Sequence, residues 1–176
     1  VGSEVVRRAR GLDMHVLGYD PFVAPERAGR IGAELASLPD LLAQSDFVTI
    51  HTPLTDASKS LLGPEELALL KPGAYIINVA RGGLVDEEEL LRALDDGRVA
   101  GAALDVFSQE PPTDYRLAQH PRVVGTPHLG ASTVEAQAGV ATEVAEQVLA
   151  VLRGQAASNT VNAPFVAPEA HAIIAP

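Results

Sequence analysis

Short apolar runs recur at similar intervals along the chain, and segments with a helical spacing of apolar residues lie between them. The runs have the length and the polar flanks of buried strands. They cover residues 15–20, 46–51, 74–79, 100–107 and 122–126. Parallel strands need a crossover connection, which a helix provides, so the alternation predicts an α/β fold with a doubly wound, Rossmann-like parallel sheet.

Two of the segments between the strands carry signals of helix ends. Asp86 and Glu89 have the spacing of a capping box, and Gly97 is placed to end the helix that follows. Pro64 is placed to open another helix, which we expect to end at residues 72–73. These signals predict two helices on either side of the strand at 74–79.

The longest predicted helix follows the last strand. It should begin at Ser132, with Glu135 completing a capping box, and end at Gly154. Its apolar residues form a stripe, which we expect to pack on a sheet. Beyond it the chain is rich in Ala and Pro and has no clear periodicity. We therefore expect one domain over residues 1–154 and, over 155–176, a connection toward a further domain.

Each predicted strand ends in polar residues. They are Asp20, His51 with Thr52, Asn78, Asp105 and Thr126. In open α/β sheets, ligands bind outside the carboxyl ends of the strands. The recurrence of polar residues at these ends predicts a ligand site along one edge of the sheet.

The first residues resemble the end of a phosphate-binding turn. Gly2 is placed as the last glycine of a G-x-G-x-x-G motif that runs into a helix, and Asp20 follows 18 residues later at the end of the next strand. The first strand and two glycines of that motif are missing from the chain. Because that strand is central in this fold, we expect two half-sheets and interpret the sequence as a fragment.

Charge and composition narrow the classes of partner. The 176 residues carry a formal net charge of −10 with only 13 Lys and Arg, which argues against nucleic acid or an anionic membrane. No apolar run is long enough to span a bilayer. Without cysteine, no disulfide or thiolate metal site is proposed, and no metal is expected. Cytoplasm is the default location.

Three charged residues each follow an apolar run and together suggest an active site: Arg81, Glu110 and His128. A guanidinium binds a carboxylate through two parallel hydrogen bonds. An imidazole moves protons near neutral pH, and a carboxylate can orient it. The set suits redox chemistry on a 2-hydroxy or 2-oxo acid.

Residues 78–86, 101–112 and 126–133 resemble the signature blocks of the D-isomer-specific 2-hydroxyacid dehydrogenases. The resemblance implies that residues 1–154 are the NAD-binding domain of this family, truncated at its start. The connection at 155–176 would then lead to a substrate domain or a C-terminal regulatory domain. The fragment alone is expected to be inactive, and a homo-oligomer is expected only by analogy with the family.

The resemblance also implies roles for single residues. Arg81 would bind the substrate carboxylate, His128 would act as general acid and base, and Glu110 would pair with the imidazole. The residues that would contact NAD are Val1, Gly2, Asp20, Thr52, Val79, Asp105, His128, Leu129, Gly130 and Ala131. Asp20 would hold the adenosine ribose and favour NAD over NADP.

The preferred substrate is less strongly specified. Residues 130–137 and 161–164 resemble those family members that oxidise 3-phosphoglycerate in the first step of serine biosynthesis. The same chemistry on glyoxylate, hydroxypyruvate or lactate is the nearest alternative. A non-enzymatic NAD-sensing module like the related corepressors is another, and a methyltransferase is ranked last.

Each residue also has an ordinary structural interpretation. Taken singly, Arg81 is a solvated turn residue, Glu110 a polar loop residue and His128 a structural histidine. Asp20 before a proline is also a turn former, and Asp105 is also suited to bracing a loop. His51 is left out of the site. Three acids, at residues 87–89, are interpreted as the first turn of a helix and not as metal ligands.

Overall fold

The computed structural model describes residues 1–155. They fall into two compact units, Val1–His128 and a second that begins at Leu129. Every strand belongs to the first unit, which is therefore the one that positions the candidate site. The predicted connection at 155–176 lies, apart from Gln155, outside the described residues, so the predicted domain boundary stays a prediction.

The strands pair only in parallel within residues 1–155 and form two sheets. The smaller sheet pairs β1 (Leu17–Gly18) with β2 (Glu34–Leu35). The larger has the order β3 (Phe47–Ile50), β4 (Ala74–Asn78), β5 (Val99–Leu104), β6 (Val123–Gly125). The parallel α/β fold and its division into two sheets are thus confirmed. The two-residue strand β2 was not predicted because it is too short to form an apolar run.

Six helices connect and follow these strands in the described part of the chain. They are α1 (Gly2–Arg10), α2 (Pro25–Ile31), α3 (Leu38–Gln44), α4 (Pro64–Ala68), α5 (Glu87–Asp95) and α6 (Val134–Leu152). The predicted cap of α5 is confirmed, because the Asp86 carboxylate accepts a hydrogen bond of 3.0 Å from the Glu89 N–H.

Two predicted helix ends were wrong. Helix α4 stops before residues 72–73, and the N–H of Lys71 instead donates to the Leu42 carbonyl in α3, 3.2 Å away. Helix α6 is capped by Thr133, whose hydroxyl accepts from the Ala136 N–H, and not by Ser132, which belongs to the preceding turn. No residue of α6 is buried, so its packing on a sheet stays a prediction.

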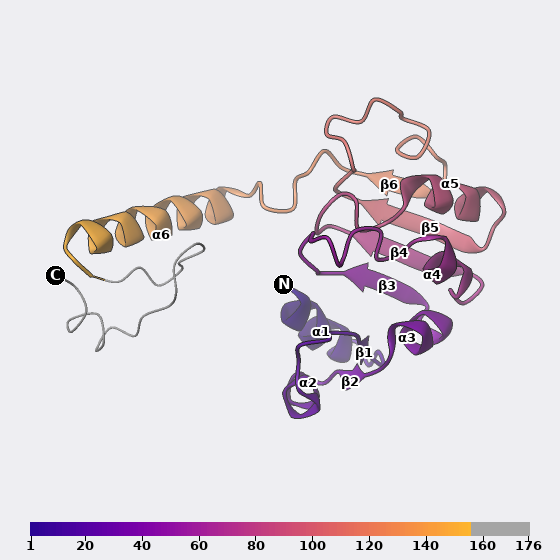
Figure 1. Cartoon of the computed structure of the whole chain (residues 1–176), viewed down its shortest axis with the longest axis horizontal. Helices are drawn as coiled ribbons and strands as arrows, with labels where there is room; N and C mark the ends of the chain where they lie inside the picture. The colour runs from indigo at the N-terminus through magenta and orange to yellow at the C-terminus, as the bar shows by residue number, and fades with distance from the viewer. Residues whose placement is uncertain (156–176) are drawn as a thin grey trace. The chain divides into compact units, whose positions relative to one another are not determined.

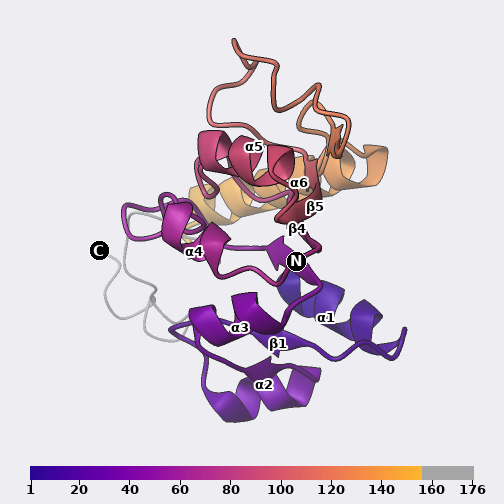
Figure 2. The same cartoon turned by 90° about the vertical axis from the view of Figure 1, so that its right-hand side faces the viewer.

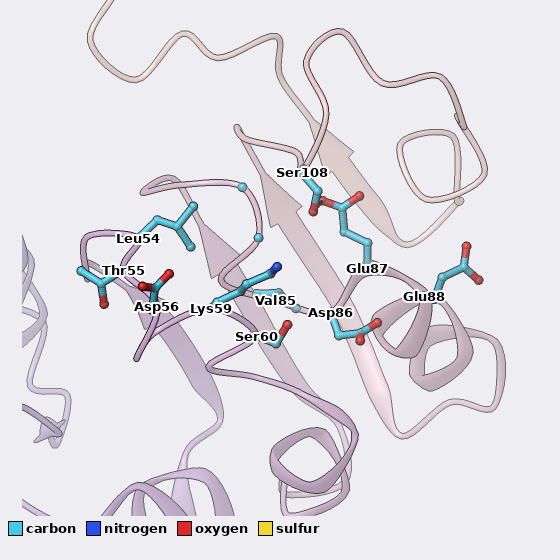
Figure 3. Close-up of a pocket in the computed structure, with 12 residues that line it drawn as sticks. Leu54, Thr55, Asp56, Lys59, Ser60, Val85, Asp86, Glu87, Glu88 and Ser108 are labelled. Atoms are coloured by element: carbon cyan, nitrogen blue, oxygen red, sulfur yellow. Dashed lines mark hydrogen bonds between the residues drawn. The ribbon is translucent and has the colours of Figure 1, made fainter.

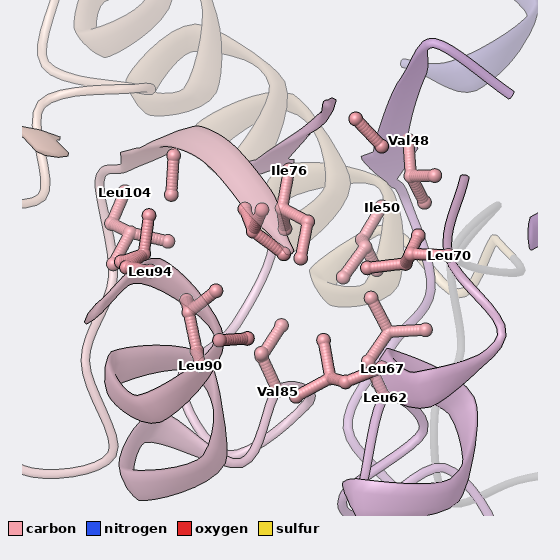
Figure 4. Packing of buried hydrophobic residues seen from close by; sticks show 14 of the residues in the cluster. Val48, Ile50, Leu62, Leu67, Leu70, Ile76, Val85, Leu90, Leu94 and Leu104 are labelled. Atoms are coloured by element: carbon pink, nitrogen blue, oxygen red, sulfur yellow. The ribbon is translucent and has the colours of Figure 1, made fainter. Parts of the chain in front are cut away.

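The hydrophobic core lies between the larger sheet and helices α4 and α5, which share one side of β4 and β5 in Figure 2. Leu67 of α4 and Leu90 of α5 join Ile76 of β4 in one buried cluster (Figure 4). The opposite face of the sheet carries Phe47 and Tyr75, whose rings stack with centroids 5.3 Å apart. Burial of alternate strand residues therefore fixes the register of the sheet.

The parallel register brings four strand ends to one edge. In Figure 1 the arrowheads of β3, β4, β5 and β6 all point the same way. The loops that leave these ends carry the residues predicted to act on a ligand. Within the part of the chain described, no helix is both long and apolar enough to cross a membrane.

Candidate active site

Buried polar residues tie the ends of the three strands β4, β5 and β6 together. The Asp105 N–H donates to the Asn78 carbonyl over 3.0 Å, and the Asp105 carboxylate accepts a hydrogen bond from the Thr126 hydroxyl. Asn78 and Asp105 are only 2% and 4% exposed. Since buried polar groups must be hydrogen-bonded, this network holds the strand ends in place. Asp105 thus links β5 to β4 and β6, and its predicted contact with the cofactor stays a prediction.

Asn78 also shapes the loop that carries Arg81. Its side-chain amide donates to the Arg81 carbonyl over 2.9 Å, and its side-chain oxygen accepts from the Ala80 N–H over 3.1 Å. The sequence placed Asn78 at a strand end but did not reveal this clamp. The available signal was an asparagine entering a turn, where its side chain commonly bonds nearby backbone.

Arg81 itself is exposed, and its Nη1 donates to the Ala80 carbonyl over 2.7 Å. It does not line the hollow that contains Glu110 and His128. The structure therefore places Arg81 at the correct edge of the sheet, but the convergence of all three predicted catalytic residues on one substrate stays a prediction.

Glu110 and His128 are in direct contact. The Nδ1 atom of His128 lies 2.6 Å from Oε2 of Glu110. The other carboxylate oxygen, Oε1, accepts a hydrogen bond of 3.0 Å from the Phe107 N–H. His128 has a φ of 55°, a left-handed backbone conformation that is uncommon outside glycine and is often found at functional sites.

These two hydrogen bonds lower the pKa of Glu110 below its ordinary value. The bond to His128 is the largest cause and the bond from Phe107 is the second, while partial burial and the nearby negative charge of Asp105 oppose them. Glu110 is therefore a carboxylate near neutral pH. When Nδ1 of His128 carries the shared proton, Nε2 is left to exchange a proton with a ligand.

The pair borders a hollow of about 450 Å³ at the strand ends. This volume is within the range of small-molecule sites. Its lining includes Asp105, Phe107, Glu110, Pro112, Tyr115, Thr126 and His128. The hollow therefore combines apolar walls with the acid–base pair.

A larger hollow of about 740 Å³ lies beside the start of α5 and is shown in Figure 3. Its lining contains one cationic side chain, Lys59, and four acidic ones, which are Asp56, Asp86, Glu87 and Glu88. The smaller hollow is the one that the His128–Glu110 pair borders, so it is the better candidate for acid–base chemistry.

Several residues predicted to contact the cofactor lie at strand and helix ends of the first unit. Gly2 begins α1, and Asp20 follows β1. Thr52 comes two residues after the end of β3, and Val79 follows β4 directly. Leu129, Gly130 and Ala131 begin the second unit, so their contact with the cofactor stays a prediction.

Comparison with known proteins decides the family. Residues 1–130 match the family described as D-isomer specific 2-hydroxyacid dehydrogenase, NAD binding domain. The chain belongs to this family. Family membership agrees with the resemblance found in residues 78–86, 101–112 and 126–133.

Individual relatives extend the comparison. Over 167 residues this family member is 55% identical to D-3-phosphoglycerate dehydrogenase 3, chloroplastic, from Arabidopsis thaliana, covering 94% of this chain and 28% of that protein. Over 176 residues it is 48% identical to D-3-phosphoglycerate dehydrogenase from Bacillus subtilis, and the match covers 100% of this chain and 34% of that protein. The chain therefore spans about a third of these relatives.

A solved relative has the same fold. The crystal structure of D-lactate dehydrogenase with NAD+ from Lactobacillus jensenii superposes with a TM-score of 0.84 at 29% identity, covering 92% of this chain and 52% of that one. Together with the matched family domain, this supports NAD as the cofactor of the family member described here.

The residues present fit NAD. No side chain from residues 1–155 caps the start of α1, and backbone N–H groups at a helix start are the kind of donor that binds phosphate. The acid in its first turn, Glu4, is already paired with Arg7 and Arg8. Asp20 is exposed and offers carboxylate oxygens suited to ribose hydroxyls, although Oδ1 also accepts from the Phe22 N–H as in a turn.

Replacing His128 by alanine should raise the pKa of Glu110 toward its ordinary value, because the largest cause of its lowering is removed. In the unchanged protein, the stabilisation from this contact is complete above the ordinary pKa of the carboxyl. It is lost as the pH falls through the lowered, folded value. Carbon-13 NMR of the glutamate side-chain carboxyls measures both titrations.

Glu4 is the internal control for this titration. Its pKa is also lowered, chiefly by hydrogen bonds from Arg8 and Arg7, and should not respond to the His128 substitution. An unchanged midpoint for Glu110 in the variant would show that the imidazole does not stabilise this carboxylate in solution.

Proposed function

We propose that this chain is the NAD-binding part of a dehydrogenase that transfers a hydride between 3-phosphoglycerate and NAD, the first step of serine biosynthesis. The observation that carries the acid–base chemistry is the 2.6 Å contact between His128 and Glu110 at the carboxyl edge of the sheet. The choice of acid is supported by 55% and 48% identity to the two D-3-phosphoglycerate dehydrogenases.

Each catalytic residue has one task in the proposed reaction. NAD, when bound, would supply the acceptor for the hydride that leaves the substrate carbon. Nε2 of His128 takes the hydroxyl proton of the substrate, and the Glu110 carboxylate stabilises the imidazolium that forms. In the reverse direction the same imidazolium donates the proton. Arg81 holds the substrate carboxylate by two hydrogen bonds after its guanidinium exchanges the Ala80 carbonyl for the ligand.

Asp20 selects the cofactor in this proposal. Its exposed carboxylate accepts hydrogen bonds from the adenosine ribose and repels a 2′-phosphate, which favours NAD over NADP. The remaining contacts with the cofactor are assigned to Val1, Gly2, Thr52, Val79, Asp105, His128, Leu129, Gly130 and Ala131. A cytoplasmic location and a homo-oligomer remain predictions made with this function.

A dehydrogenase for another 2-hydroxy acid is the second candidate. The similarity to a D-lactate dehydrogenase structure favours this candidate. The sequence identity to that structure is 29%, however, whereas the identity to the D-3-phosphoglycerate dehydrogenase from Arabidopsis thaliana is 55%. The described residues account for the hydroxyl and carboxylate common to all these acids. Among these residues, no lysine or arginine that would single out a phosphate lines the smaller hollow.

Steady-state NADH formation by the full-length protein that contains this chain tests the proposal. We expect a higher kcat/KM for oxidation of 3-phosphoglycerate than for oxidation of D-lactate. It should also be higher than the kcat/KM for reduction of glyoxylate or hydroxypyruvate, once the equilibrium constants of the reactions are used to express the values for one direction. A preference for one of the other acids would support the second candidate. Tight NADH binding without turnover of any acid would favour an NAD-sensing protein.

Replacing His128 by alanine should lower kcat by about 10²- to 10⁴-fold, the usual contribution of a general acid–base group. NADH affinity, measured by fluorescence titration, should change much less. The matched control is His15→Ala, because that histidine is 68% exposed and pairs with Glu34 in the smaller sheet. Persistent turnover with collapsed NADH affinity would contradict the assigned role.

Replacing Arg81 by lysine should raise the KM for the acid and lower kcat, because a point charge does not reproduce the planar fork. The loss in kcat/KM should be about tenfold or more, since a hydrogen bond to a charged group contributes about 1.5–3 kcal/mol. Arg92→Lys is the control, as Arg92 pairs with Glu89 on α5. Unchanged kcat and KM in the Arg81 variant would contradict its assigned role in binding the substrate carboxylate.

A further inference from the structure

The peptide between Phe107 and Ser108 is packed tightly against Gly82. A Cβ atom at Gly82 would lie 1.9 Å from the Phe107 carbonyl oxygen and 2.3 Å from its carbon, so only glycine is accommodated. Gly82 directly follows Arg81 in the loop after β4. The loop that carries Arg81 and the loop that carries Glu110 therefore meet at this one peptide.

Glu87, the first residue of α5, holds the same peptide from its other end. Its Oε1 atom accepts hydrogen bonds from the Ser108 N–H over 2.5 Å and from the Ser108 hydroxyl over 2.7 Å. Figure 3 shows the two side chains directed toward each other. The carbonyl of this peptide is thus fixed by Gly82 and its N–H by Glu87.

The neighbouring peptide contacts the acid–base pair. The Phe107 N–H donates to Oε1 of Glu110, whose Oε2 is the atom in contact with His128. A rotation of the segment at Phe107 and Ser108 would move this N–H and release one oxygen of the carboxylate. Contacts therefore run without interruption from Glu87 to His128.

The ordinary role of Glu87 as an acid at a helix start does not explain this arrangement. Glu88 and Glu89 also lie in the first turn and supply negative charge to the positive end of α5. Glu88 pairs with Arg116 and Glu89 with Arg92. Of the three, Glu87 is the one bonded to Ser108.

We propose that Glu87 is a positioning residue of the active site, which holds the Phe107–Ser108 segment so that the Phe107 N–H keeps Glu110 aimed at His128. The inference rests on the proposed function. It assigns no direct contact between Glu87 and substrate. Its effect on the reaction passes through Glu110.

The first test compares Glu87→Ala with Glu87→Gln in the full-length protein. The alanine variant should lower kcat by about tenfold to hundredfold, because small misplacements of a reacting group cost up to about 10²-fold. The KM for the acid and the affinity for NADH should each change by less than about threefold, which corresponds to a binding free energy change of under about 1 kcal/mol. Glutamine keeps an acceptor oxygen for Ser108 and should restore most of the rate.

Glu88→Ala is the matched control, since Glu88 lies in the same helical turn and pairs with surface Arg116. It should leave kcat near that of the unchanged protein. Ser108→Ala provides a milder variant, because it removes the hydroxyl bond and keeps the N–H bond to Glu87. It should lower kcat less than Glu87→Ala, and it remains informative if the latter fails to fold.

A double-substitution cycle separates positioning from general loss of stability. In a Glu110→Gln background, Glu87→Ala should lower kcat by less than about threefold, because its target is already impaired. Full additivity of the two effects, or an unchanged kcat in Glu87→Ala, would overturn the proposal. Absence of turnover in the unchanged protein would instead contradict the proposed function.

Discussion

The parallel pairing of β3, β4, β5 and β6 is the constraint on which the candidate site depends. Leucines of α4 and α5 bury one face of this sheet, and a shift of register by one residue would turn those apolar positions outward. The register is therefore strongly specified. Because parallel strands end at the same edge, the loops after β4, β5 and β6 become neighbours, although their residues are far apart in the sequence.

Side-chain hydrogen bonds to backbone give those loops their defined shape. Asn78 clamps the loop that carries Arg81, and Glu87 binds the segment that precedes Glu110. The close approach of Gly82 to the Phe107 carbonyl joins the two loops. The contacts of Asn78 and Glu87 are hydrogen bonds to backbone groups that leave the sheet ladder, whereas the contact of Gly82 is close packing.

The distribution of charge bears on the anionic substrate that is proposed for this acidic chain. The chain has a formal net charge of −10, and the larger hollow is lined mainly by acids. In the smaller hollow, Glu110 is in contact with His128. Arg81 lies on the neighbouring loop and is exposed, and in the proposed function it binds the substrate carboxylate. The proposed oxidation of a 2-hydroxy acid needs this combination of acid–base pair and separate cation.

The sequence by itself was sufficient for the parallel α/β fold, for the Asp86 cap and for the polar residues at the strand ends, because periodicity and capping are local properties. It was insufficient for β2, for the end of α4 and for the choice of Thr133 over Ser132 as a cap, where competing backbone contacts decide. The pairing of Glu110 with His128, 18 positions away, was expected only through the family resemblance, and the contact of Glu87 with Ser108, 21 positions away, came from the tertiary structure alone. Such contacts depend on strand register and loop conformation, which no short stretch of residues encodes.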